Sequence, residues 1–281
     1  MFKKVTPHGT IVKKHNMIIR KNVKVKSLLS ARILALAISC LRADESEFQE
    51  LYKIDLKPVM PKKRSGSWKN DIDKACEDLS ESGLRLDNYE NVPTRRRALT
   101  KEVYEKDGYI YVEFNSKATP FLLNLEKHFT EIPFLEYLKL PTNYTQRIFE
   151  ILYSFKYKGK GTVSVEDLHD WLNTKKNMQK DFSRLRTRVL EKAQDEIHKL
   201  TSLRYKMKYI KKGNKIDKVE FTFLKSPHEI GNIKAVAVAI IDTPEYSKAF
   251  TCYSEKKDPK CLGNTSEICK VCHSHRKTFL S

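Results

Sequence analysis

A cationic face on one predicted helix carries the residues best suited to bind a polyanion. Over residues 178–200 apolar side chains recur at helical spacing, and the opposite face of the first turns is polar and positive. Arg184 and Arg188 are one helical turn apart and therefore point the same way. Such a helix fits the major groove of B-DNA, where arginine can bridge the O6 and N7 acceptors of guanine. The candidate DNA-binding residues of this face are Lys180, Ser183, Arg184, Arg186, Thr187 and Arg188.

A predicted hairpin with a cationic tip follows this helix. Residues 203–209 and 216–224 alternate apolar and polar around a turn that contains three lysines and no acid. Gly213 and Asn214 favour a tight turn whatever binds, but they do not explain the lysines. Because lysine holds phosphate with little demand on geometry, the tip is predicted to contact the DNA backbone through Lys211, Lys212, Asn214 and Lys215.

A weaker cluster of the same kind lies in the first half of the chain. Ser67 is predicted to cap a helix that ends near Gly83, and helix N-termini favour phosphates. Four carboxylates between 71 and 78 dilute the positive charge of this helix, so we expect a weaker DNA contact than at 178–200. The candidates are Lys62, Lys63, Arg64, Ser67, Lys69, Asn70 and Lys74.

Four of the six cysteines lie within the last 30 residues. Their spacing is C-x8-C-x7-C-x2-C, and two histidines follow at 273 and 275. One C-x2-C pair is typical of zinc sites, and a short extension would gain stability from a structural metal. The predicted ligands are Cys252, Cys261, Cys269 and Cys272, with four free thiols as the alternative. Cys40 and Cys76 are instead expected to be buried, inert thiols on apolar helix faces.

Composition and missing motifs narrow the function further. The 281 residues include 54 Lys+Arg against 35 Asp+Glu, a net charge of +19 that favours a polyanionic partner. The chain contains no P-loop, no dinucleotide fingerprint, no G-x-S-x-G and no H-E-x-x-H, so we expect a protein that is not an enzyme and needs no cofactor to bind DNA. The apolar stretch 28–41 is too short to span a membrane and contains Arg32, which favours a cytoplasmic protein without membrane contact.

The order of the predicted elements repeats along the chain. Each half combines helices with a hairpin: helices at 28–41, 46–54 and 67–83 precede a hairpin at 102–114, and helices at 144–155, 165–172 and 178–200 precede the hairpin described above. This order predicts an α+β fold of two tandem winged-helix domains plus a small cysteine-rich C-terminal extension. The expected boundaries are a basic N-terminal arm at 1–21, domains at 22–140 and 141–226, and the extension at 227–281.

The chain resembles the iteron-binding plasmid replication initiator (Rep) proteins. The similar segments, in order, are VKVKSLLSARILALAISCL, HFTEIPFLEYLKLPTNYTQRIFEIL, GTVSVEDLHDWLN and KDFSRLRTRVLEKAQDEIHKLTSLRYKMKYIKKGNKIDKVEFTF. The resemblance implies binding of directly repeated duplex sites at an origin, with positions 180–188 in the major groove and 211–215 beside it. It also implies monomers that open the origin and recruit the host initiator and helicase, and dimers that repress their own promoter. The cysteine-rich extension and the segment 55–66 depart from the family pattern.

Two other functions agree with the same residues. A transcriptional repressor would use the same two DNA-binding modules away from an origin. A DNA-nicking initiator of the rolling-circle type would use Tyr153 or another tyrosine as its nucleophile. Supercoiled origin DNA separates the second function from initiation by binding alone, because a nickase relaxes it or becomes covalently attached to it.

Overall fold

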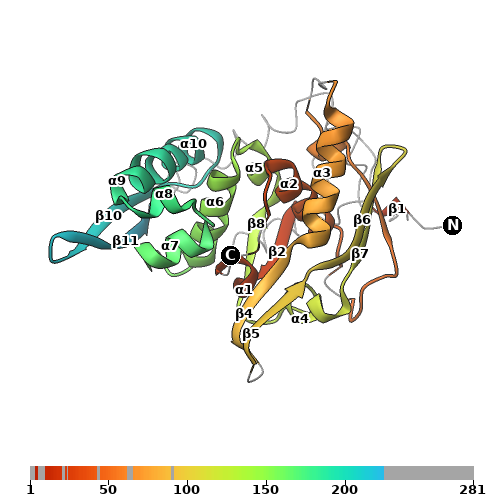
Figure 1. Cartoon of the computed structure of the whole chain (residues 1–281), viewed down its shortest axis with the longest axis horizontal. Coiled ribbons are helices and arrows are strands. Elements are labelled where there is room, and N and C mark those ends of the chain that lie inside the picture. The colour runs from red at the N-terminus through yellow and green to blue at the C-terminus, as the bar shows by residue number, and fades with distance from the viewer. Residues whose placement is uncertain are drawn as a thin grey trace, which may run out of the picture. The chain divides into compact units, whose positions relative to one another are not determined.

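The computed structural model describes residues 4–5, 10–20, 23, 25–42, 45–61, 66–89 and 92–224. Contacts divide the chain into two units, Met1–Ser226 and Pro227–Ser281, and every described residue belongs to the first (Figure 1). Among the described residues, no helix is long and apolar enough to cross a membrane.

Two packed helices form the centre of the first half of the chain. Helix α2 (Leu28–Ser39) begins at Ser27, whose Oγ accepts a hydrogen bond from the Ser30 amide at 3.0 Å. Most side chains of α2 are buried, because α3 (Trp68–Glu81), the strand β2 (Ile11–His15) and the short 3-10 helix η1 (Lys57–Val59) all pack against it. Both helices were predicted from apolar spacing, and both are confirmed.

A four-stranded sheet supports these helices. Its order is β1 (Lys4–Val5), β3 (Tyr52–Asp55), β7 (Tyr109–Phe114) and β6 (Thr100–Lys106), and only the β1–β3 pair is parallel. The predicted turn at 107–108 joins β6 to β7, and both Asp107 (φ 54°) and Gly108 (φ 78°) adopt the left-handed conformation that tight hairpin turns require. A second hairpin pairs β4 (Gly83–Tyr89) with β5 (Val92–Ala98).

Two expectations for the first half are wrong. Instead of the predicted helix at 46–54, residues 52–54 belong to the strand β3, where Tyr52 and Ile54 are fully buried and Lys53 between them is half-buried. The prediction of an N-terminal arm at 1–21 is also wrong, because residues 11–20 are part of the folded domain. There β2 (Ile11–His15) pairs with β8 (Phe129–Pro133), and α1 (Asn16–Arg20) buries two isoleucines. The short helices η2 (Ser116–Ala118), α4 (Thr119–Leu122) and α5 (Phe134–Lys139) flank β8 in sequence.

The second half repeats the combination of helices and hairpin. Helix α6 (Asn143–Lys156) leads into β9 (Lys160–Ser164) and α7 (Val165–Trp171). Ser164 caps α7, since its Oγ accepts a hydrogen bond from the Asp167 amide at 2.9 Å. Strands β10 (Tyr205–Lys212) and β11 (Lys215–Phe223) pair as a hairpin, and β9 adds to β11, so that β11 is the central strand.

A buried ion network joins α6 to the N-terminal segment. Lys14 Nζ and Arg147 Nη1 each lie 2.6 Å from a different oxygen of Glu150, and the Lys14 and Glu150 side chains are only 4% and 2% exposed. Arg147 Nη2 also donates to the carbonyls of Ile19 and Trp171, at 2.8 and 3.3 Å. The network therefore fastens β2, α1 and α7 to one helix.

Candidate nucleic-acid interface

The predicted helix at 178–200 is present but is not one regular helix. It begins with the short α8 (Lys176–Gln179), breaks, and restarts as α9 (Phe182–Leu185), followed by a π-helical stretch, η3 (Arg186–Glu191), and α10 (Lys192–Leu200). Asp181 causes the restart, because its side chain accepts a hydrogen bond from the Ser183 amide. We call residues 182–200 the reading helix. Lys180 belongs to the end of α8 and not to the reading helix.

The reading helix buries one face and exposes the other. Leu185, Val189, Ala193 and Ile197 are buried, as predicted from their spacing. The exposed side holds Ser183, Arg184, Arg186, Thr187 and Arg188. The π-helical turn was not predicted, although such turns are frequent at functional sites. It coincides with three of these five residues.

The exposed arginines differ in how firmly they are already held. Arg186 Nε lies 3.3 Å from Glu191 Oε1, and Arg184 Nη1 makes a long 3.5 Å contact with the Asn177 carbonyl. Arg188 has no ion-pair partner within the described part of the chain. Arg188 and Arg184 are therefore freer than Arg186 to contact a ligand.

The hairpin β10–β11, which we call the wing, contacts the start of the reading helix through β10. Lys212 pairs with Lys215, so Gly213 and Asn214 form a two-residue turn, with Gly213 at a φ of 61°. The wing tip, defined as Lys211, Lys212, Asn214 and Lys215, is exposed. The Phe182 and Tyr209 rings meet edge to face at 5.3 Å, which joins the first turn of the reading helix to β10.

Exposed lysines also continue along the wing, away from its tip. Lys206, Lys208 and Lys218 are exposed on β10 and β11, and none of them is among the predicted contacts. The signal that could have found them is the alternation along part of each strand, where Tyr205, Met207, Val219 and Phe221 are buried or half-buried.

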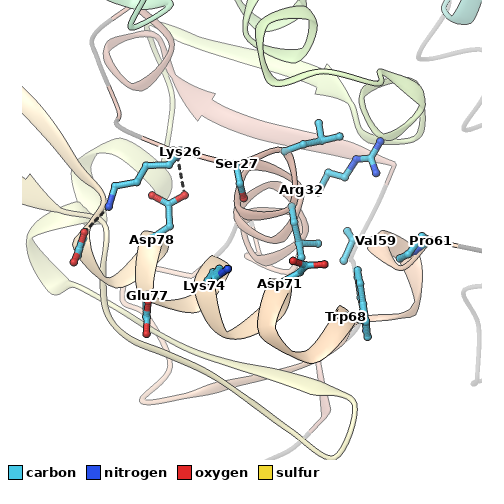
Figure 2. Close-up of a pocket in the computed structure, with 13 residues that line it drawn as sticks. Lys26, Ser27, Arg32, Val59, Pro61, Trp68, Asp71, Lys74, Glu77 and Asp78 are labelled. Atoms are coloured by element: carbon cyan, nitrogen blue, oxygen red, sulfur yellow. Dashed lines mark hydrogen bonds and ion pairs between the residues drawn. The ribbon is translucent and has the colours of Figure 1, made fainter. Parts of the chain in front are cut away.

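The first-half cluster is less suited to DNA in the structure. Lys62, Lys63 and Arg64 lie outside the described residues. The predicted cap at Ser67 is wrong, because its side chain makes no capping hydrogen bond and donates to the Asp71 carboxylate instead. Asn70 is exposed, and Lys69 Nζ lies 4.0 Å from Glu105. Lys74 lines a groove together with the carboxylates of α3 (Figure 2). The described lysines of this cluster therefore lie close to carboxylates, which agrees with the weaker DNA contact expected from the sequence.

The cysteines separate into two groups. Cys40 and Cys76 are free and buried, as predicted, and burial raises the pKa of each thiol to about 12. Cys252, Cys261, Cys269 and Cys272 lie outside the described residues, so the zinc site stays a prediction. Within the described ranges no group of three His, Cys, Asp or Glu side chains could hold a metal.

Tyr153 has a poor environment for a nucleophile. Its ring packs against Phe149 at a centroid distance of 4.6 Å, and burial raises its pKa well above the ordinary value for tyrosine. A nucleophilic tyrosine needs access to the phosphodiester and a favourable path to its ionised form. The geometry at this site therefore favours a packing role.

Comparison with known proteins adds two family matches and a structural similarity. Residues 11–153 match the family model described as initiator replication protein, WH1, and residues 164–223 match initiator Rep protein, WH2. A comparison with curated proteins gives no match. Among 21 matching solved chains is the crystal structure of the Pi initiator protein in complex with iteron DNA. That structure has a TM-score of 0.62 and 18% identity, over 76% of this chain and 96% of its own, which shows a shared fold. The chain has two tandem winged-helix domains and belongs to the family of plasmid replication initiator (Rep) proteins.

Proposed function

We propose that this initiator binds directly repeated duplex sites, or iterons, at its plasmid origin, through the reading helix and the wing. The observation that carries the proposal is the exposure of Arg184 and Arg188 on a helix whose first turn is joined to a lysine-rich hairpin by the Phe182–Tyr209 contact. A helix with free arginines can read guanine edges in the major groove, while a hairpin beside it meets phosphates. The iteron complex of the structurally similar Pi initiator supports this assignment.

The later steps of initiation are proposed from the family resemblance. Monomers would open the origin and recruit the host initiator and helicase, and dimers formed through the first domain would repress the initiator's own promoter. The three arginines of the reading helix and the three lysines of the wing tip would act at the first step, binding, and leave the later steps to other surfaces.

A binding titration tests the proposal directly. The protein is titrated against a duplex carrying one repeat from the DNA flanking its gene, a scrambled duplex and each single strand. We expect the repeat duplex to bind at least about 10³-fold more tightly than the scrambled duplex at physiological salt. Equal affinity for both duplexes, or preference for a single strand, would contradict the proposal.

The initiator is also proposed to act by binding and not by cleaving DNA. The environment of Tyr153 supports this, because burial disfavours the ionised form of its hydroxyl. Incubation with supercoiled origin DNA and Mg²⁺ should leave the DNA supercoiled and free of attached protein. Relaxed DNA that disappears in a Tyr153→Phe variant would identify a nicking enzyme.

A further inference from the structure

The outer face of the second winged-helix sheet carries lysines well beyond the wing tip. Tyr205 and Val219 are buried on the inner face of this sheet. Their sequence neighbours Lys206 and Lys218 lie on the outer face, and so does Lys208, two residues further along β10. All three lysines are exposed, and none of them makes an ion pair with another described residue.

The strand register makes these lysines continuous with the wing tip. Residues of β10 alternate between the two faces, so Lys212 of the tip lies on the same face as the two lysines nearer the start of the strand. Lys215 pairs with Lys212 and Lys218 pairs with Ile210, whereas Asp217 pairs with no residue of β10. This shift in register puts both lysines of β11 on the outer face. We call Lys206, Lys208, Lys212, Lys215 and Lys218 the lysine strip.

Neighbouring residues do not neutralise the lysine strip. Glu220 lies opposite Lys208 in the register, but it forms its ion pair with Lys160 of β9, at 3.2 Å. Lys212 and Lys215 lie directly opposite each other, and like charges at such positions destabilise a sheet. The strip is therefore a row of positive charge whose repulsion a bound polyanion would relieve.

Protection of a sheet edge explains only part of the strip. Lysines on an edge strand discourage pairing with other chains, and β10 is an edge strand. Lys218, however, lies on β11, whose two edges are already paired with β10 and β9. A charge at that position has no edge to protect, which indicates a partner for the strip.

The length and position of the strip fit a short stretch of duplex DNA. From Lys212 to Lys206 the strand rises by about 20 Å, at about 3.4 Å per residue. Each DNA strand carries one phosphate per about 3.4 Å of axis, so the strip spans about six base pairs. The inner face of the sheet packs on the reading helix, where Tyr209 meets Phe182. Because the strip is on the opposite face, a straight duplex held by that helix would reach only the wing tip.

We infer that the lysine strip binds the duplex that flanks the repeat on the side of the wing tip, so that this DNA curves from the tip onto the outer face of the sheet. The inference rests on the proposed binding of the repeat by the reading helix and the wing. Flanking duplex is continuous with the DNA at the tip, and it brings a regular row of phosphates to a row of lysines. Bending DNA costs a free energy that depends on its sequence, so flexible TA or CA steps at the bend should favour the contact.

The test measures the affinity for one repeat with and without flanking DNA. The repeat is extended on one side or the other by about 15 base pairs, more than twice the span of the strip, or by a single strand of the same length. The variant K206Q/K208Q/K218Q removes three lysines of the strip and leaves the wing tip intact. The control K127Q/K139Q/K199Q removes the same charge at three exposed lysines away from the strip.

We expect the duplex extension on one side only to raise the affinity of wild type by about five- to tenfold. The same extension should steepen the salt slope by about two to three, because three further phosphate contacts contribute about 0.9 each. The control should show the same gain as wild type. K206Q/K208Q/K218Q should bind the repeat alone within about twofold of the control and lose the gain from the extension.

Three results would overturn the inference. They are no gain from either duplex extension, a gain that persists in K206Q/K208Q/K218Q, and an equal gain from a single-stranded extension. Weaker binding of this variant than of the control to the repeat alone would place the strip on the repeat itself, which also overturns it. Wild type that binds the repeat but gains nothing from flanking duplex contradicts this inference alone. Wild type that binds the repeat no more tightly than a scrambled duplex contradicts the proposed function as well.

Discussion

At the scale of single residues, the arginines of the reading helix are distinguished by their existing partners. Arg186 shares its charge with Glu191, whereas Arg184 has only a long contact to a carbonyl and Arg188 has no ion-pair partner in the described part of the chain. An arginine that must break an ion pair to reach a base gains less from that contact. Arg184 and Arg188 should therefore carry more of the base preference than Arg186.

Replacing Arg184 or Arg188 with alanine should weaken binding to the cognate site by about 1–3 kcal/mol and relax the base preference locally. The measurement is a binding-site selection with each purified variant. Arg186→Ala is the matched control and should have a smaller effect on the selected sequence.

Lysine substitutions in the wing tip should behave differently. Lys211→Ala, Lys212→Ala and Lys215→Ala should weaken binding to all sequences alike, because phosphate contacts carry no direct sequence information. Each should also reduce the salt slope by about one. If the arginine variants keep the wild-type preference while a wing-tip variant changes it, the roles of the two elements are reversed.

The stability of the fold should depend strongly on the charge of Glu150. Burial alone would raise its pKa, but Lys14 and Arg147 outweigh burial and hold the pKa below the ordinary value. A carboxylate whose pKa is lowered by folding stabilises the protein above its unfolded pKa, and this stability is lost as the pH falls through the folded value. Glu150→Gln should cost about 3–5 kcal/mol at pH 7, because Lys14 stays charged and buried without its partner.

Urea unfolding at pH 7 and at pH 4 measures this effect. The difference between wild type and Glu150→Gln should narrow at the lower pH, where protonation begins to weaken the network in wild type. The double variant K14M/E150L should recover part of the lost stability, since it removes the buried charge of Lys14 and leaves Arg147 bound to the carbonyls of Ile19 and Trp171. A loss below about 1 kcal/mol in the single variant would contradict the importance of the network.

At the scale of elements, β9 approaches α6 too closely for any side chain at one position. A Cβ placed on Gly161 would lie 2.8 Å from Phe155 Cβ, whereas a Cβ on Gly66 would meet nothing within 4 Å. Gly161→Ala should therefore lower the free energy of unfolding by about 1–3 kcal/mol, through overpacking between strand and helix. Gly66→Ala is the matched control, and equal urea midpoints for the two variants would contradict the prediction.

The C-terminal extension should contain a tetrahedral zinc site. Purified, reduced protein is expected to carry about one zinc per chain, held by Cys252, Cys261, Cys269 and Cys272. Metal analysis checks this, and Cys269→Ser with Cys272→Ser should abolish the zinc. Cys76→Ser is the control, because that thiol is buried, with a pKa raised to about 12 by burial. Zinc near zero in wild type would favour four free thiols.

At the scale of the whole molecule, a net charge of +19 dominates the long-range interaction with DNA. Each lysine or arginine that neutralises a phosphate releases counterions, so log K should fall with log salt by about 0.9 per contact. We expect a slope between about −4 and −8, from the exposed cations of the reading helix and the wing tip. Titrations between about 50 and 300 mM KCl, a range around physiological ionic strength, measure this slope. An affinity that does not change with salt would contradict the winged-helix interface.

Several elements could be predicted from the sequence because their causes are local. The turn at Asp107–Gly108 and the turn at Gly213–Asn214 follow from residues that tolerate positive φ, and the alternating strands on either side complete each hairpin. The buried stripe of the reading helix follows from apolar spacing in the same way. These local signals were sufficient for both hairpins and for the buried face of the reading helix.

Other features depend on contacts between residues far apart in sequence. The chain by itself determined the basic charge, both hairpins, most helices and the cationic face at 184–188. Only the tertiary structure decided that Lys14 is buried, because its partner Glu150 lies 136 residues away. It also made 52–55 a strand, since β7 supplies the neighbouring backbone hydrogen bonds. Local chemistry thus set the elements, whereas long-range pairing set which charges are buried and which are left exposed to bind DNA.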